Sequence, residues 1–161
     1  MKQVIEAAAE QAGRHPDMIL AGHVHNYQRL TKTLPDGSQV PYLVTGAGGY
    51  FNLHHIMKVN GEPMVPPVTF DDKQSDPVTL ERYSADHHGF MRMQITDKLI
   101  IGRYYTVPRQ HEPYSKGNQL LDYFEYDWRQ KRYVPNSLPA SSPTVAPITV
   151  SMKGQKYRHA S

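Results

Sequence analysis

The sequence predicts a domain of the α/β class in which β hairpins make up most of the regular structure. Near the amino end, a helical stripe of apolar residues is followed by a short apolar strand. Two pairs of strand-like runs joined by tight polar turns come later. The 13 prolines and 11 glycines among 161 residues indicate many loops between these elements. A chain of this length is long enough to bury one hydrophobic core.

The first 21 residues are expected to form a helix and a strand. Apolar side chains recur on one face of residues 2–12, and Gly13 suits the left-handed conformation that ends many helices. His15 and Pro16 form the turn, so His15 is expected to occupy a loop. Met18 to Ala21 then form a short buried strand.

Two hairpins and a final strand are expected to follow. The first hairpin turns at an Asp-Gly pair and the second at an Asp-Lys pair, and Asp-Gly between alternating runs is a strong hairpin signal. A Gly-Ala-Gly-Gly segment at 46–49 is interpreted as a strand-end turn that needs positive φ. The expected strands cover residues 27–34, 39–45, 90–96, 99–107 and 120–126.

Composition divides the chain into a domain and a tail. Residues 1–133 are expected to form the domain, with 51–86 as a long irregular insertion because prolines interrupt it. In residues 134–161, proline alternates with serine, alanine and threonine before a few basic residues. This composition is typical of a flexible, weakly basic tail.

The motif that carries chemistry follows the first predicted strand. His23 and His25 come directly after Gly22, where a strand end could present two imidazoles to metal ions. Imidazole is a normal ligand of Zn and Fe. If the backbone turns there, the rings could diverge toward two ions about 3.5–4 Å apart, as in two-metal hydrolytic sites. Two surface histidines in a tight turn, or one Zn held by both rings and a distant group, are the alternatives.

The stretch from Gly22 to Arg29 resembles the GHxH motif of the calcineurin-like metallophosphoesterases, and its Tyr-Gln-Arg ending resembles the purple acid phosphatase branch. The resemblance covers about residues 2–127. It implies the C-terminal part of a two-sheet sandwich flanked by helices. It also implies that His23 ligates one metal and His25 the other, while Gly22 and Asn26 belong to the supporting turn. The implied activity is hydrolysis of phosphate esters by metal-bound water, commonly with Fe and either Zn or Mn.

The family's other metal-binding motifs are expected before Gly22, where only residues 1–21 stand. The D-x-H spelling at Asp86 lies in a predicted loop, and Gly117-Asn118 lacks the histidine and acid that should follow. The adjacent rings of His54 and His55 are expected to point apart. The chain is therefore expected to be an incomplete domain that leaves one sheet face uncovered, with no catalytic residue identified and little activity alone. Its implied partners are a phosphate ester substrate and either the missing N-terminal half of the domain or another chain.

Composition excludes several other classes of function. The net charge is only +3 and the body of the chain has no run of five or more basic residues, so a nucleic-acid partner is not expected. The chain has no cysteine and therefore no disulfide, and no apolar stretch approaches the ~18 residues of a membrane span. The first residues lack a signal peptide's apolar segment, and the compartment stays open. The alternative function is a non-catalytic remnant or interaction module built on the same fold.

Overall fold

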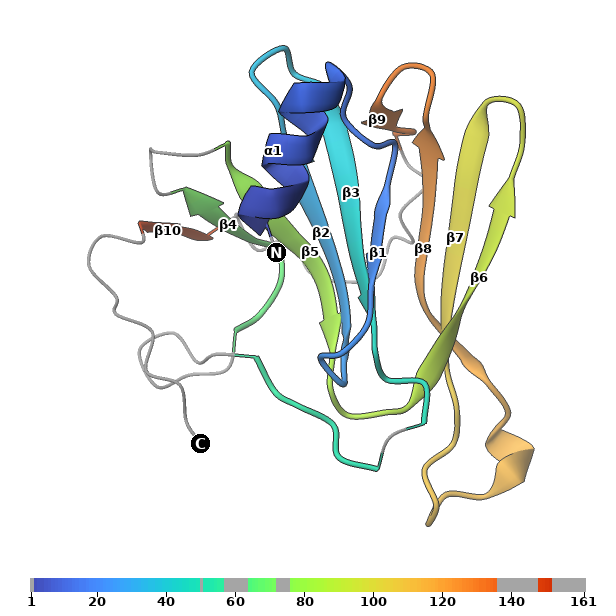
Figure 1. The fold of residues 1–161 in the computed structure, drawn as a ribbon. Coiled ribbons are helices and arrows are strands. Elements are labelled where there is room, and N and C mark those ends of the chain that lie inside the picture. Colours follow the sequence, from blue (N-terminus) through green and yellow to red (C-terminus); the bar gives the residue numbers. More distant parts are fainter. Residues whose placement is uncertain (1, 50, 57–63, 72–75, 136–147, 152–161) are drawn as a thin grey trace.

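A computed structural model describes residues 2–49, 51–56, 64–71, 76–135 and 148–151. These residues form two β-sheets that lie face to face, with an α-helix on the outer face of the larger one (Figure 1). The protein therefore belongs to the α/β class and is built mostly of strands, as the sequence predicts.

The larger sheet mixes parallel and antiparallel pairs in the order β1-β3-β2-β5-β4-β10. Its strands are β1 (Ile19–Ala21), β2 (Tyr27–Thr33), β3 (Gln39–Thr45), β4 (Val68–Asp71), β5 (Val78–Ser84) and β10 (Ile148–Ser151). The smaller sheet is an antiparallel meander, which contains β6 (Gly89–Ile95), β7 (Leu99–Thr106), β8 (Gln119–Asp127) and β9 (Arg132–Tyr133). A short 3₁₀ helix, η1 (Tyr114–Lys116), lies between β7 and β8.

The local sequence signals correctly place the helix and both hairpins. Helix α1 (Lys2–Ala12) ends at Gly13, whose φ of 63° is the left-handed conformation expected there. On the outer face of the larger sheet, Glu6 of α1 accepts a hydrogen bond from the Lys32 ammonium at 2.7 Å, which ties the helix to β2. The turns between β2 and β3 and between β6 and β7 also fall where the sequence puts them.

The expectation of an irregular insertion over 51–86 is wrong for its second half. Strand β5 lies there and pairs antiparallel with β2 from Val78 to Ser84, which places it inside the larger sheet. β4 pairs with the other edge of β5. The prolines stand before these strands rather than within them, and the run from Val78 is rich in residues that favour β structure. Residues 57–63 and 72–75 lie outside the described part.

The expectation of a flexible tail over 134–161 needs a similar correction. β10 pairs in parallel with β4, so at least this segment of the tail belongs to the larger sheet. Its partner lies about eighty residues earlier in the chain, and local composition carries no sign of such a pairing. Residues 136–147 and 152–161 lie outside the described residues.

The hydrophobic core lies between the sheets. Leu43 from β3 packs with a buried group from the smaller sheet: Ile100, Phe124 and Tyr126. Beside it, the Tyr27 and Tyr104 rings stack with centroids 3.8 Å apart. Strand β2 therefore faces the core directly along the residues that follow the histidine motif.

The outer face of the larger sheet is only partly covered. Next to α1 lies an apolar cavity of about 220 Å³, whose walls include Ile19, Leu30 and Tyr42. Strand β1 is the terminal strand of the sheet on this side. An apolar hollow thus lies on the outer face of the larger sheet. None of the described helices is both long and apolar enough to cross a bilayer.

Candidate metal centre

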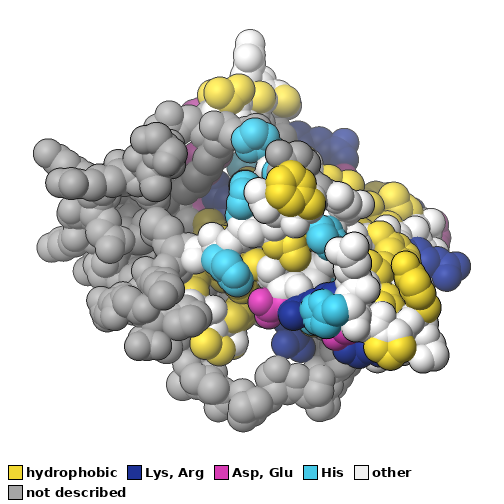
Figure 2. Space-filling model, turned by 90° about the horizontal axis from the view of Figure 1, so that it is seen from below, with side chains coloured by type: hydrophobic (Ala, Val, Ile, Leu, Met, Phe, Trp, Pro, Cys, Tyr) yellow, Lys and Arg dark blue, Asp and Glu magenta, His cyan; other side chains and the backbone are white. Residues whose placement is uncertain are grey.

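The histidine motif lies in residues 22–26, which connect the carboxyl end of β1 to β2. We call this segment the histidine loop. Strand β1 runs parallel to β3, so the loop sits at the sheet edge where parallel strands end. Seen from below, this end of the molecule carries several histidine side chains (Figure 2). The loop therefore has the location that the sequence predicts for a ligand-bearing turn.

The backbone bends sharply within the loop, and the bend falls on a histidine. The Val24 amide donates to the Gly22 carbonyl at 2.9 Å, and the Asn26 amide donates to the Val24 carbonyl at 2.8 Å. These are two successive three-residue turns. His23 has a φ of 70°, whereas Gly22 does not have positive φ. The left-handed conformation of the turn therefore falls on His23 rather than on the glycine before it, and side chains disfavour this conformation.

A glycine on the neighbouring strand end fixes how close the loop can approach. A Cβ on Gly46 would lie 2.0 Å from the carbonyl oxygen of Val24, which no side chain could tolerate. The Gly46 amide also donates to the Asn26 carbonyl at 3.0 Å. In the 46–49 segment, Gly49 has positive φ (151°), but Gly46 serves close contact with the loop instead. The 46–49 segment thus packs against the histidine loop, a role that its amino-acid sequence alone does not indicate.

The two imidazoles differ in their surroundings. The side chain of His23 is exposed, while that of His25 is half-buried. The His25 Nδ1 lies 3.1 Å from the Asn52 carbonyl oxygen, which can only accept a hydrogen bond. This contact selects the tautomer with hydrogen on Nδ1 and the lone pair on Nε2.

Asn26 is fully buried and joins the loop to its surroundings. Its Nδ2 donates to the His54 carbonyl at 2.9 Å, and its Oδ1 accepts from the Gln28 amide at 2.9 Å. Because an Asn side chain has both donors and acceptors, these contacts use its two ends. Asn26 thus lies where a supporting turn residue is expected.

A third imidazole, which sequence reasoning set aside, lies against His25. The His54 and His25 rings stack with centroids 4.7 Å apart and an interplanar angle of 30°. His55 is exposed. His54 is exposed as well, so its stack with His25 lies at the surface. Sequence separation hid the contact, because 28 residues lie between the two histidines.

The loop that carries His87 and His88 reaches the same end of the molecule, because the Gly89 amide donates to the Ala47 carbonyl at 3.1 Å. The His87 Nε2 lies 3.9 Å from the Glu112 carboxylate. The D-x-H spelling at Asp86 accordingly lies in a loop before β6, as the sequence predicts.

The donor set of the described residues fits part of a metal site. In the tautomer that the Asn52 contact selects, the His25 lone pair is on Nε2, a nitrogen donor of the kind that Zn, Fe or Mn binds, and His23 lies two residues away. Within the described ranges, no three His, Cys, Asp or Glu side chains come together in a way that could hold an ion. Two neutral imidazoles leave the charge of two dications unbalanced, so a dinuclear centre needs further ligands from elsewhere.

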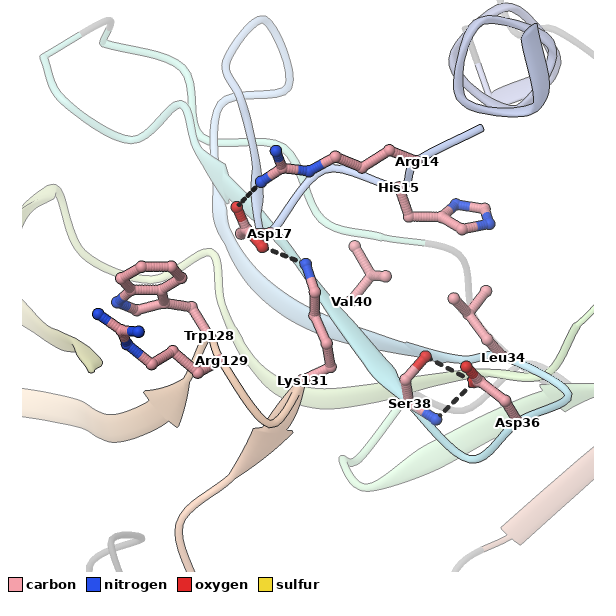
Figure 3. Close-up of a pocket in the computed structure, with 10 residues that line it drawn as sticks. All are labelled: Arg14, His15, Asp17, Leu34, Asp36, Ser38, Val40, Trp128, Arg129 and Lys131. Atoms are coloured by element: carbon pink, nitrogen blue, oxygen red, sulfur yellow. Dashed lines mark hydrogen bonds and ion pairs between the residues drawn. The ribbon is translucent and has the colours of Figure 1, made fainter. Parts of the chain in front are cut away.

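A larger cleft of about 510 Å³ opens at the opposite end of the molecule (Figure 3). It lies between the β2–β3 hairpin and the turn after β8. The Asp17 carboxylate stands between Arg14, at 3.2 Å, and the Lys131 ammonium, so two cations already neutralise it. His15 lines this cleft and lies in the turn between α1 and β1, as the sequence predicts.

Comparison with protein-family models, with curated proteins and with solved structures finds no match to this chain.

Proposed function

We propose that this chain contributes His23 and His25 to the centre of a metal-dependent phosphoesterase, and that its two sheets are the C-terminal part of a metallophosphoesterase-type sandwich. The main support is the hydrogen bond between His25 Nδ1 and the Asn52 carbonyl, which leaves the lone pair on Nε2. Carbonyl or carboxylate partners of this kind accompany most metal-ligating histidines.

The strained backbone of His23 supports the same function. A left-handed φ costs a residue with a side chain about 1–2 kcal/mol, and glycine avoids this cost. His23 keeps φ at 70° although Gly22 is its immediate neighbour. Backbone strain of this kind is concentrated at functional sites, where the position of a side chain matters more than stability.

In this function the chain's own residues bind and orient. His23 and His25 are ligands, and the turns around Val24 set the separation of their backbones. Two ions, Fe with Zn or Mn, would supply a Lewis acid for the phosphoryl oxygens and a water acidic enough to attack phosphorus near neutral pH. The substrate is a phosphate ester.

The remaining ligands come from a segment outside the described residues, either the N-terminal half of the same domain or another chain. Strand β1 and the apolar cavity beside it lie on the side of the sheet that such a segment would cover. Carboxylates from that segment would offset the charge of the ions, which neutral imidazoles cannot do.

Metal binding and hydrolysis test this function. Calorimetric titration of the full chain with Zn²⁺ or Mn²⁺ should give a heat of binding that His23→Ala and His25→Ala each remove. His15→Ala is the matched control, because His15 is an exposed histidine at the opposite end. Turnover of p-nitrophenyl phosphate is then measured on the chain completed at its amino end by its own coding sequence. Undiminished turnover in His23→Ala would eliminate the ligand assignment.

The alternative is a non-catalytic interaction module. The terminal position of β1 and the apolar cavity beside it favour this function too, because both suit docking on another chain. If the completed protein binds no metal but the chain still assembles through this side of the sheet, the module is the correct function.

A further inference from the structure

The segment after the glycine turn runs alongside the histidine loop and bonds to it at alternate residues. The Asn52 carbonyl faces His25 Nδ1 at 3.1 Å. Two residues later, the His54 amide donates to the His25 carbonyl at 2.9 Å, and the His54 carbonyl accepts from Asn26. Two residues further, the Ile56 amide donates to the Tyr83 hydroxyl at 2.8 Å.

This spacing of two residues is that of an extended chain. Residues 52, 54 and 56 make these contacts through their backbones, although the side chains of Asn52, His54 and His55 are all exposed. The segment is attached to the histidine loop at its start and to β5, through Tyr83, at its end. It is therefore anchored at both ends beside His25, although it pairs with none of the described strands.

We infer that residues 52–56 form a positioning arm for His25, in which His54 is the positioning residue. This inference rests on the proposed function for its purpose but not for its geometry. The Asn52 carbonyl fixes which nitrogen of His25 carries the proton. The stacked His54 ring fixes the rotation of the His25 side chain, since rotation of the His25 ring would break the parallel contact at 4.7 Å.

The two contacts depend on each other. Rotation of the His25 ring about its side-chain bonds would carry Nδ1 away from the Asn52 carbonyl, so the stack protects the hydrogen bond. The side-chain amide of Asn26 donates a hydrogen bond to the His54 carbonyl, and Asn26 is itself fully buried. Because the arm is attached to β5 through Tyr83, its contacts restrict the orientation of the His25 imidazole. Outer contacts of this kind typically contribute about 10–100-fold in metal affinity.

The test compares His54→Ala, His54→Phe and His55→Ala in the full chain. Phenylalanine keeps a flat ring of similar size and preserves stacking, whereas alanine removes it. His55→Ala removes a histidine from the same segment whose side chain is exposed. The tautomer of His25 is measured by ¹⁵N NMR of histidine-labelled protein at about pH 8.5, where free imidazole is neutral. Zn²⁺ affinity is measured on the same samples.

The wild type is expected to show hydrogen on Nδ1 of His25. His54→Ala should convert His25 to a mixture of tautomers and weaken Zn²⁺ binding about tenfold, while His54→Phe and His55→Ala should leave both unchanged. An unaltered His25 tautomer in a folded His54→Ala variant would overturn the arm. If no protein binds Zn²⁺ but the tautomer still changes in His54→Ala, the arm stands and the proposed function fails.

Discussion

Arg29 and Asp122 form a buried ion pair that joins the two sheets. The Arg29 Nε donates to one carboxylate oxygen at 2.7 Å and its terminal nitrogen to the other at 3.2 Å. The side chains are 2% and 0% exposed. The Tyr27 hydroxyl donates to the same carboxylate at 2.7 Å, and burial, reinforced by Asp122, raises the pKa of Tyr27 so that it stays a donor. The pair fixes β2 on β8 directly behind the histidine loop.

Replacing Asp122 by asparagine should destabilise the protein by about 3–5 kcal/mol, because it leaves the Arg29 charge buried without its counterion. Urea denaturation followed by circular dichroism measures the change. Asp97→Asn is the control, since Asp97 is an exposed carboxylate in the β6–β7 turn. A loss below about 1 kcal/mol would mean that water or another group compensates Arg29.

Alanine at Gly46 should disturb the histidine loop, whereas alanine at Gly22 should not. The new Cβ at position 46 would meet the Val24 carbonyl oxygen at 2.0 Å, while nothing lies within 4 Å of the corresponding point on Gly22. We expect Gly46→Ala to cost about 1–3 kcal/mol in the free energy of unfolding and to shift the amide resonances of residues 23–26. Equal effects of the two substitutions would contradict the close contact.

Glycine at position 23 should be more stable than alanine there by about 1 kcal/mol, because His23 has a φ of 70°. Both variants lose the imidazole, so the comparison isolates the backbone. At His25, whose φ is not positive, the order should reverse because glycine loses more entropy on folding. Chemical denaturation of the four variants measures both differences. The same order at both positions would show that the turn does not strain His23.

Glu112 should make stability depend on pH. Lys116 donates to its carboxylate at 2.8 Å and, with the Arg109 amide, lowers the pKa of Glu112 from 4.5 to about 2. The folded pKa is the lower one, so the stabilisation is complete above 4.5 and is lost as the pH falls toward 2. Glu112→Gln should therefore lower the melting temperature at pH 7 but not near pH 2.

The control for this prediction is Glu10→Gln, which changes an exposed carboxylate on α1. Melting curves of the three proteins between pH 7 and pH 2 provide the measurement. If the difference between wild type and Glu112→Gln persists unchanged at the lowest pH, the ion pair with Lys116 is not its source.

The elements that sequence analysis placed correctly depend on neighbours in the chain. The Asp-Gly turn fixes the β2–β3 hairpin within a few residues, and Gly13 ends α1 by its own conformation. Strand β5 was missed because the surrounding prolines dominate the composition, while its pairing with β2 spans about fifty residues. The parallel contact of β10 with β4 is more distant still.

The candidate site likewise has features that local sequence predicts and features that depend on distant segments. The motif itself identified His23 and His25 as the residues to examine, and their roles as ligands stay predictions. The Asn52 carbonyl, the His54 ring and the close approach at Gly46 could not be read from the motif, because each depends on segments that meet only after folding. A backbone carbonyl in particular carries no side-chain signature.

Asn26 and Tyr27 are fully buried, so the histidine loop should acquire its shape when the core folds. Local opening of the loop would have to detach the strand that immediately follows His25 from the interior, so its amides should exchange with solvent almost as slowly as those of the core. The geometry around His25 is then complete once the chain has folded. A ligand that bound at the loop would therefore lose little free energy to ordering it.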